Sequence, residues 1–203
     1  MVRPATLEKW LQRGKQKAAV ARVLRKPMTT TEIRRAAHSL NPHIQLRDIW
    51  FIMGQFEKCG LVRCLNPRDI TGKFYYWTEK GKKVVQSAFG FTIRSPPRNV
   101  DWSLSAHVIR GKVRRFVLLE LKKMRAVGNE AKTAIQIRRN LKDQYHVGLN
   151  SVKTALKALS ARKLVQCVGV TEKWKQKLYR LTEMGRRIVD QLENSDLFTA
   201  NPF

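Results

Sequence analysis

The sequence predicts a mainly helical protein with small β hairpins, organised as two similar domains in tandem. Three segments recur at a nearly constant spacing of 103, 103 and 104 residues: HIQL at 43–46 and HVGL at 146–149, LVRC at 61–64 and LVQC at 164–167, YYWTEKG at 75–81 and YRLTEMG at 179–185. A constant spacing over several segments indicates an internal duplication. Elsewhere the apolar residues recur mostly with the period of a helix, whereas the repeated segments hold short runs typical of strands.

The duplication divides the 203 residues into two small domains. We expect the first domain at residues 1–88, a linker at 89–105, the second domain at 106–193 and a tail at 194–203. The linker contains Pro96 and Pro97, which favour a stiff, extended backbone.

Both domains are strongly basic. The chain has 41 Lys plus Arg and 15 Asp plus Glu, a formal net charge of +26. Residues 1–90 carry 18 basic and 6 acidic side chains, and residues 106–203 carry 21 and 8. So many positive charges repel one another in a compact fold, and binding of a polyanion relieves this repulsion. Nucleic acid is therefore the leading candidate partner, followed by a ribonucleoprotein surface or an acidic membrane.

The remaining composition favours the interior of a cell. No run of about 18 apolar residues occurs, so no membrane span is expected, and the N-terminus lacks the apolar core of a signal peptide. Three cysteines fit a reducing compartment rather than a disulfide framework. We expect a cytoplasmic, nucleoid-associated protein.

In the first domain, residues 5–25 are predicted to form one basic helix that ends before Pro27. A second helix begins after Thr29, because Thr29 and Glu32 have the spacing of a capping box. A third helix is expected from about Leu46 to Cys59. Gly60 follows as a C-terminal cap.

A hairpin and a closing helix complete this domain. The strands are expected at residues 61–65 and 73–77, joined by a turn-rich tip at 66–72. Thr78 is predicted to cap the closing helix, which carries the apolar Val84 and Val85.

The second domain repeats this order. A first helix is expected at about 107–125, ended by Gly128 and Asn129, and Thr133 with Gln136 restates the capping box. The later elements follow in sequence: a second helix with Ile135, Ile137 and Leu141 inward, a third helix at 150–163, strands at 164–168 and 177–181, a tip at 169–176, and a final helix capped by Thr182.

Three helices, a strand, a tip, a strand and a closing helix, twice over, resemble the winged helix-turn-helix family. The resemblance covers nearly the whole chain, and it is carried by the capping-box helix, the LVRC or LVQC strand, and the strand-to-helix joint YYWTEKG or YRLTEMG. That joint is similar to those of bacterial and archaeal regulators. The resemblance implies that the third helix enters the major groove of DNA while the tip, or wing, lies along the phosphates.

The residues of the second domain agree with this role. Helical spacing places Val152, Ala155, Leu156 and Leu159 in the core. The hydrogen-bonding and cationic residues left facing solvent are Asn150, Ser151, Lys153, Thr154 and Lys157. The wing adds Lys173, Trp174, Lys175 and Lys177, which are suited to phosphate contacts with one aromatic wedge. The competing interpretation is a solvated helix face and a soluble loop.

The third helix of the first domain departs from this pattern. Aligned with the second domain, Trp50 takes the place of Lys153 and Phe51 that of Thr154. Three interpretations of this aromatic patch remain open. It forms a protein interface, it stacks on unpaired bases, or the first helix or the linker covers it. The polar residues nearby are Gln45, Arg47, Gln55 and Lys58, and the wing adds Arg63, Arg68 and Lys73.

Arginine pairs occupy matching places in the second helix of each domain: Arg34 with Arg35, and Arg138 with Arg139. The second helix commonly crosses the DNA backbone in such folds, so these pairs are candidate phosphate clamps. The alternative for each pair is a contribution to solubility alone.

No motif for catalysis or metal binding is recognisable. Zinc-ligand spacing, a nucleophile beside a base, a phosphate-cradling glycine loop and paired carboxylates are all missing. We therefore expect no enzyme, no cofactor and no metal site.

Three functions remain in competition. The first is a double-stranded DNA-binding transcriptional regulator or chromosome-associated factor. The second is an adaptor in a protein complex, or a homodimer, with Trp50 and Phe51 in the interface. The third is a protein that binds structured RNA or a ribonucleoprotein, since phosphate contacts do not distinguish the two sugars.

Overall fold

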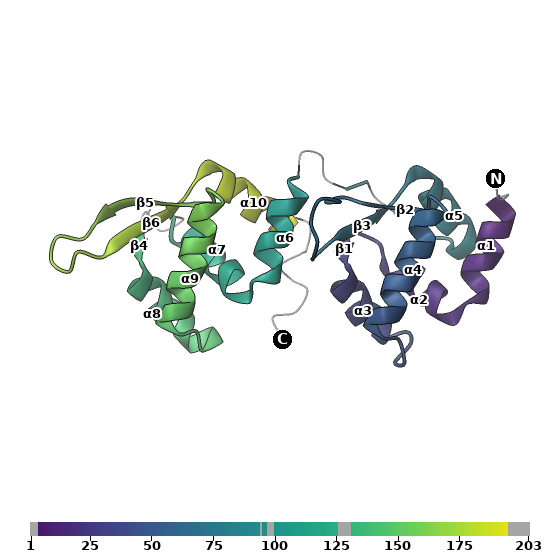
Figure 1. Cartoon of the computed structure of the whole chain (residues 1–203), viewed down its shortest axis with the longest axis horizontal. Helices are drawn as coiled ribbons and strands as arrows, with labels where there is room; N and C mark the ends of the chain where they lie inside the picture. Colours follow the sequence, from purple (N-terminus) through teal and green to yellow (C-terminus); the bar gives the residue numbers. More distant parts are fainter. Residues whose placement is uncertain (1–3, 94, 97–99, 126–130, 195–203) are drawn as a thin grey trace. The chain divides into compact units, whose positions relative to one another are not determined.

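The computed structural model describes residues 4–93, 95–96, 100–125 and 131–194 (Figure 1). The chain is mainly helical, with two small three-stranded antiparallel sheets. It divides into two compact units, residues 1–98 and residues 99–203, which we call unit 1 and unit 2.

Unit 1 begins with helices and closes with a helix around a small sheet. Its elements in order are α1 (Pro4–Arg13), α2 (Lys15–Val23), β1 (Met28–Thr29), α3 (Thr30–His38), α4 (Leu46–Lys58), β2 (Val62–Cys64), β3 (Phe74–Trp77) and α5 (Glu79–Phe89). The strands lie in the order β1-β3-β2, with Met28 opposite Tyr75 and Val62 opposite Trp77.

Unit 2 has the same order of elements. They are α6 (Trp102–Arg110), α7 (Lys112–Arg125), β4 (Lys132–Thr133), α8 (Ala134–Tyr145), α9 (Leu149–Ala161), β5 (Val165–Val170), β6 (Lys177–Leu181) and α10 (Glu183–Asn194). The strand order β4-β6-β5 matches that of unit 1, with Lys132 opposite Tyr179 and Val165 opposite Leu181.

The core of unit 1 is built from the apolar faces of its helices and one face of its sheet. Leu11, Val20, Ile33, Ile49 and Phe56 are fully buried. The ring of Phe56 also lies 5.5 Å from the ring of Trp77, which joins α4 to β3. This packing orients α4 so that its remaining face points to solvent.

Both predicted capping boxes are confirmed. The backbone N–H of Glu32 donates to Oγ1 of Thr29 at 3.3 Å, and the backbone N–H of Thr29 donates to the Glu32 carboxylate at 2.7 Å. Thr133 and Gln136 make the same pair of bonds in unit 2. Each box satisfies amide groups that a helix start leaves without partners.

The prediction of a single first helix was wrong in both domains. The expected helix at 5–25 is divided at Gly14 into α1 and α2, which ends at Val23, and residues 107–125 belong to α6 and α7, separated at Gly111. Both glycines have extended backbone angles, with φ near −101° and −102°. Glycine weakens a helix interior by about 1 kcal/mol relative to alanine, so packing of the two halves outweighs helical continuity.

The sheets also differ from expectation. The two-residue strands β1 and β4 add a third strand to each sheet, and β5 continues through Gly169 and Val170, which were expected in the tip. A bulge between Cys167 and Gly169 interrupts the pairing of β5 with β6. Strands of two residues form only by pairing with the neighbouring β3 or β6, and they are too short to show an alternating pattern in the sequence.

Two smaller expectations changed. Ile135 was expected to face inward, but its side chain is 40% exposed. The expected linker at 89–105 contains the end of α5 at Phe89 and the start of α6 at Trp102. The expected helix break at Gly128 and Asn129, and residues 195–203 of the expected tail, lie outside the described residues.

Candidate nucleic-acid interface

The exposed face of α9 consists of the polar and cationic residues that the helical period places there. Val152, Ala155, Leu156 and Leu159 are buried, as predicted, where α9 packs against α7 and α8. The candidate contact residues are all exposed: Asn150, Ser151, Lys153, Thr154 and Lys157. α9 therefore offers two ammonium groups and three short hydrogen-bonding side chains on one open helix face.

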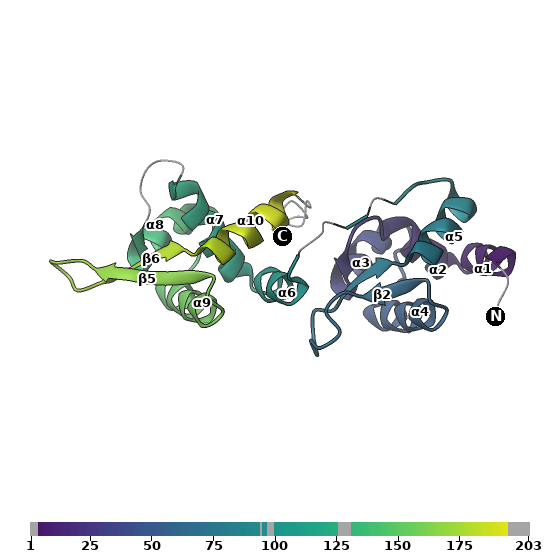
Figure 2. The same cartoon turned by 90° about the horizontal axis from the view of Figure 1, so that it is seen from above.

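The β5–β6 hairpin projects away from the body of unit 2 in both views (Figures 1 and 2). Its tip is held by hydrogen bonds around Thr171. The Thr171 N–H donates to the carbonyl of Gln176 at 2.8 Å, the Lys175 N–H donates to the carbonyl of Thr171 at 3.0 Å, and the Gln176 N–H donates to Oγ1 of Thr171 at 3.1 Å. This turn exposes Lys173, Trp174 and Lys175, and Trp174 is 71% exposed.

The charges of unit 2 are unevenly distributed. Lys122 of α7 pairs with Asp190 and Glu193 of α10, and Glu183 pairs with Arg186 and Arg187 within α10. Over the described residues, by contrast, no carboxylate forms an ion pair with the candidate cations of α9 and the hairpin: Lys153, Lys157, Lys173, Lys175 and Lys177. These uncompensated ammonium groups leave a positive surface for an anionic partner.

The arginine pairs are placed unequally. Arg34 and Arg35 on α3 are both exposed, whereas only Arg139 of the second pair is. Arg138 is half-buried on α8, and its Nε is enclosed without a hydrogen-bond partner among the described residues. Arg139 is therefore the more accessible of the two for a phosphate.

On α4 of unit 1, the aromatic residues are exposed. Trp50 is 60% exposed and Phe51 is 69% exposed, so neither the first helix nor the described part of the linker covers them, contrary to one of the interpretations above. The indole Nε1 of Trp50 donates to Oγ1 of Thr30 at 3.3 Å, which holds the ring beside the start of α3. Arg47 lies on the same face with a largely exposed side chain, 3.9 Å from Asp48.

The β2–β3 hairpin of unit 1 has a tip organised by one buried amide. Oδ1 of Asn66 accepts a bond from the Phe74 N–H at 2.7 Å, and its Nδ2 donates to Asp69 and to the Gly72 carbonyl. Arg63 and Arg68 are exposed beside this tip, and Lys73 is half-buried. The tip also displays Ile70, which is 94% exposed.

One group of residues was missed by the sequence reasoning. In the sequence, Trp10 shares a helical apolar spacing with Leu11 and Leu24, which predicts a core position. In the structure it is half-buried and lines the α1–α2 corner with Arg13 and Lys17. A signal was present: Arg-Gly-Lys occurs at 13–15 and again at 110–112, at the two helix breaks.

Comparison with known proteins gave no match among family models, curated proteins or solved structures. Over the residues that the structure covers, no three His, Cys, Asp or Glu side chains gather to hold a metal ion. Within those same residues, every helix is too short or too polar to cross a bilayer.

Proposed function

We propose that this chain is a tandem winged helix-turn-helix protein, derived from an internal duplication, that binds double-stranded DNA. Its role would be that of a transcriptional regulator or a chromosome-associated factor in the cytoplasm. Unit 2 makes the principal contact: α9 enters the major groove, and the β5–β6 hairpin follows the phosphates as a wing.

The observation that carries the proposal is the separation of charge in unit 2. Among the described residues, the ion pairs of unit 2 lie on α7 and α10, and the lysines of α9 and the hairpin have no carboxylate partner. The major groove is about 12 Å wide and accepts one helix. Asn150, Ser151 and Thr154 would then meet base edges, while Lys153 and Lys157 reach phosphates.

Arg139 on α8 and the exposed pair Arg34 and Arg35 on α3 add phosphate contacts. Arg47, Arg68 and Lys73 extend such contacts to unit 1. Each phosphate contact releases counterions, so the affinity should fall steeply with salt.

The test is a titration of duplex DNA at several salt concentrations. Lys153→Ala with Lys157→Ala should lower the log–log salt slope by about 1.8, since each neutralised phosphate contributes about 0.9. The control Lys123→Ala with Arg187→Ala removes the same charge from α7 and α10, where Arg187 already pairs with Glu183, and should leave the slope nearly unchanged. Equal effects of the two double variants would refute the placement of α9.

The same titration distinguishes the RNA alternative. We expect duplex DNA to compete more strongly than a single strand or a structured RNA at matched salt. Tighter binding of structured RNA would replace DNA with RNA as the proposed partner.

A second candidate role, self-association or protein binding through unit 1, is favoured by the exposure of Trp50 and Phe51. Aromatic residues are enriched at the centre of protein interfaces. The surrounding Arg47 and Lys58 suit a partner that carries acidic groups. This role is compatible with DNA binding by unit 2.

A further inference from the structure

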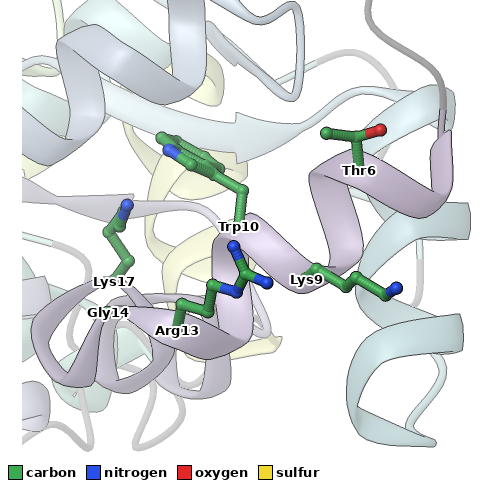
Figure 3. Close-up of a pocket in the computed structure, with 6 residues that line it drawn as sticks. All are labelled: Thr6, Lys9, Trp10, Arg13, Gly14 and Lys17. Carbon is green, nitrogen blue, oxygen red and sulfur yellow. The ribbon is translucent and has the colours of Figure 1, made fainter.

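The corner between α1 and α2 forms a hollow of about 560 Å³ that is open to solvent. Its lining residues are Thr6, Lys9, Trp10, Arg13, Gly14 and Lys17 (Figure 3). The volume lies within the range of about 300–1,000 Å³ typical of small-molecule pockets. Three of the six lining residues are cationic and none is acidic, so the hollow is suited to an anion.

An aromatic ring and two cations meet inside this hollow. The edge of Phe56 supports Trp10 from the core, with ring centroids 5.8 Å apart. On the side of the hollow, the Lys17 ammonium lies 4.1 Å from the centroid of the same ring. Figure 3 shows the Arg13 guanidinium beside the indole, whereas the Lys9 ammonium extends away from it.

Gly14 brings Lys17 to the ring. A Cβ on Gly14 would come within 2.5 Å of Cε of Lys17, so the absence of that atom lets the lysine stem fold across the helix break. The contact of an exposed ammonium with an aromatic face is weak, and lysine has a flexible stem. Lys17 can therefore leave the ring when a better partner for its charge arrives.

The equivalent corner of unit 2 lacks this arrangement. Gly111 replaces Gly14, Arg114 replaces Lys17, and His107 takes the place of Trp10. There the Arg114 Nε donates to the His107 carbonyl at 2.9 Å, so the guanidinium is hydrogen-bonded to the backbone of its own unit. The helix break is thus common to both units, whereas the tryptophan ring that lines the corner with Arg13 and Lys17 belongs to unit 1.

We propose that the α1–α2 corner of unit 1 is a binding site for one nucleotide, either free or within a nucleic-acid strand. The phosphate is held by Arg13 and Lys17, with Lys9 at the margin, and the base stacks on the Trp10 face that Lys17 vacates. Arginine presents several donors to phosphate oxygens, and base stacking on aromatic rings tolerates every base. The site belongs to unit 1, whereas α9 and the β5–β6 hairpin belong to unit 2.

The experiment measures binding of adenosine monophosphate and of an eight-nucleotide single strand to the full chain, by calorimetry and tryptophan fluorescence. Arg13→Gln with Lys17→Gln should weaken binding of at least one of these ligands by about tenfold or more. The control Lys15→Gln with Lys83→Gln removes the same charge from exposed positions outside the hollow and should change the Kd less than about twofold.

Trp10→Phe tests the stacking without removing the ring that packs on Phe56. This variant should lose the quenching that the base causes and keep the Kd within about threefold. If binding of the monophosphate depends on Arg13 and Lys17, the site takes a free nucleotide. If only binding of the oligonucleotide depends on them, the site takes one nucleotide of a strand.

The proposal is overturned if both charge variants behave alike for both ligands, or if inorganic phosphate binds as tightly as the monophosphate. Lys153→Ala with Lys157→Ala should leave the monophosphate response intact, because α9 belongs to unit 2. Duplex binding by unit 2 and nucleotide binding at this corner therefore succeed or fail independently.

Discussion

The indole Nε1 of Trp77 donates a hydrogen bond to the carbonyl of Leu24, 2.6 Å away, and so joins the end of β3 to the chain that follows α2. Both residues are buried. Trp77→Phe would leave the Leu24 carbonyl without its donor and a small cavity beside Phe56. We expect a loss of about 1–3 kcal/mol in the free energy of unfolding of unit 1, measured by denaturant titration. Duplex binding by unit 2 should be unchanged.

Gly81 and Gly185 let the helices α5 and α10 approach the backbone just before β2 and β5. A Cβ on either residue would lie 2.0 Å from a backbone oxygen, that of Leu61 or that of Leu164. Gly81→Ala should therefore destabilise unit 1 by about 3 kcal/mol, and Gly185→Ala should do the same to unit 2. Gly54→Ala is the matched control, because nothing lies within 4 Å of its added Cβ on α4. A helix interior gains about 1 kcal/mol from this change, so a loss of stability there would contradict the argument.

The exposed aromatic pair of α4 is predicted to support self-association rather than folding. Trp50→Ala with Phe51→Ala should change the free energy of unfolding by less than about 1 kcal/mol, since both side chains are mostly exposed. Sedimentation at increasing concentration should show weaker self-association, by about 30-fold in Kd if the pair is a hot spot. Leu40→Ala removes another exposed apolar group and serves as the control. An unchanged sedimentation profile would show that the protein does not self-associate through α4.

The hairpin tip allows its charge and its aromatic ring to be tested separately. Lys173→Ala should reduce the salt slope of duplex binding by about 0.9. Trp174→Ala should lower the affinity by about tenfold and leave the slope unchanged, because the indole carries no charge. Both side chains are exposed, so the fold should tolerate either change. An effect of Trp174→Ala on the slope would show that the tip had rearranged.

His107 is predicted to make unit 2 sensitive to acid. Burial, and then the positive charges of Arg114, Arg162 and Arg110, lower the pKa of His107 from 6.5 to about 4. The unfolded chain takes up the proton near pH 6.5, before the folded chain does, so the stability falls as the pH drops from about 6.5 to about 4. His107→Gln should flatten this part of the profile of melting temperature against pH. Parallel profiles for the two proteins would contradict the assignment.

Much of the candidate interface could be predicted because it follows from local periodicity. The buried positions Val152, Ala155, Leu156 and Leu159 determine which side of α9 faces solvent, and 3.6 residues per turn are enough to find them. Local chemistry also predicted the return strand at Lys177–Leu181. The exposure of Trp50 could not be predicted in this way, since an aromatic residue at such a position is equally suited to packing.

Local patterns were enough to predict the third helix, the hairpin and the closing helix of each unit, the two capping boxes and the polar face of α9, because each depends on residues within a few positions of one another. Long-range packing, by contrast, sets the helix breaks at Gly14 and Gly111, the short strands β1 and β4, and the hollow around Trp10. Each of these depends on whether distant segments pack well enough to outweigh a local preference. Trp10 has the spacing of a core residue, yet its half-exposed ring follows from where α2 turns back at the corner.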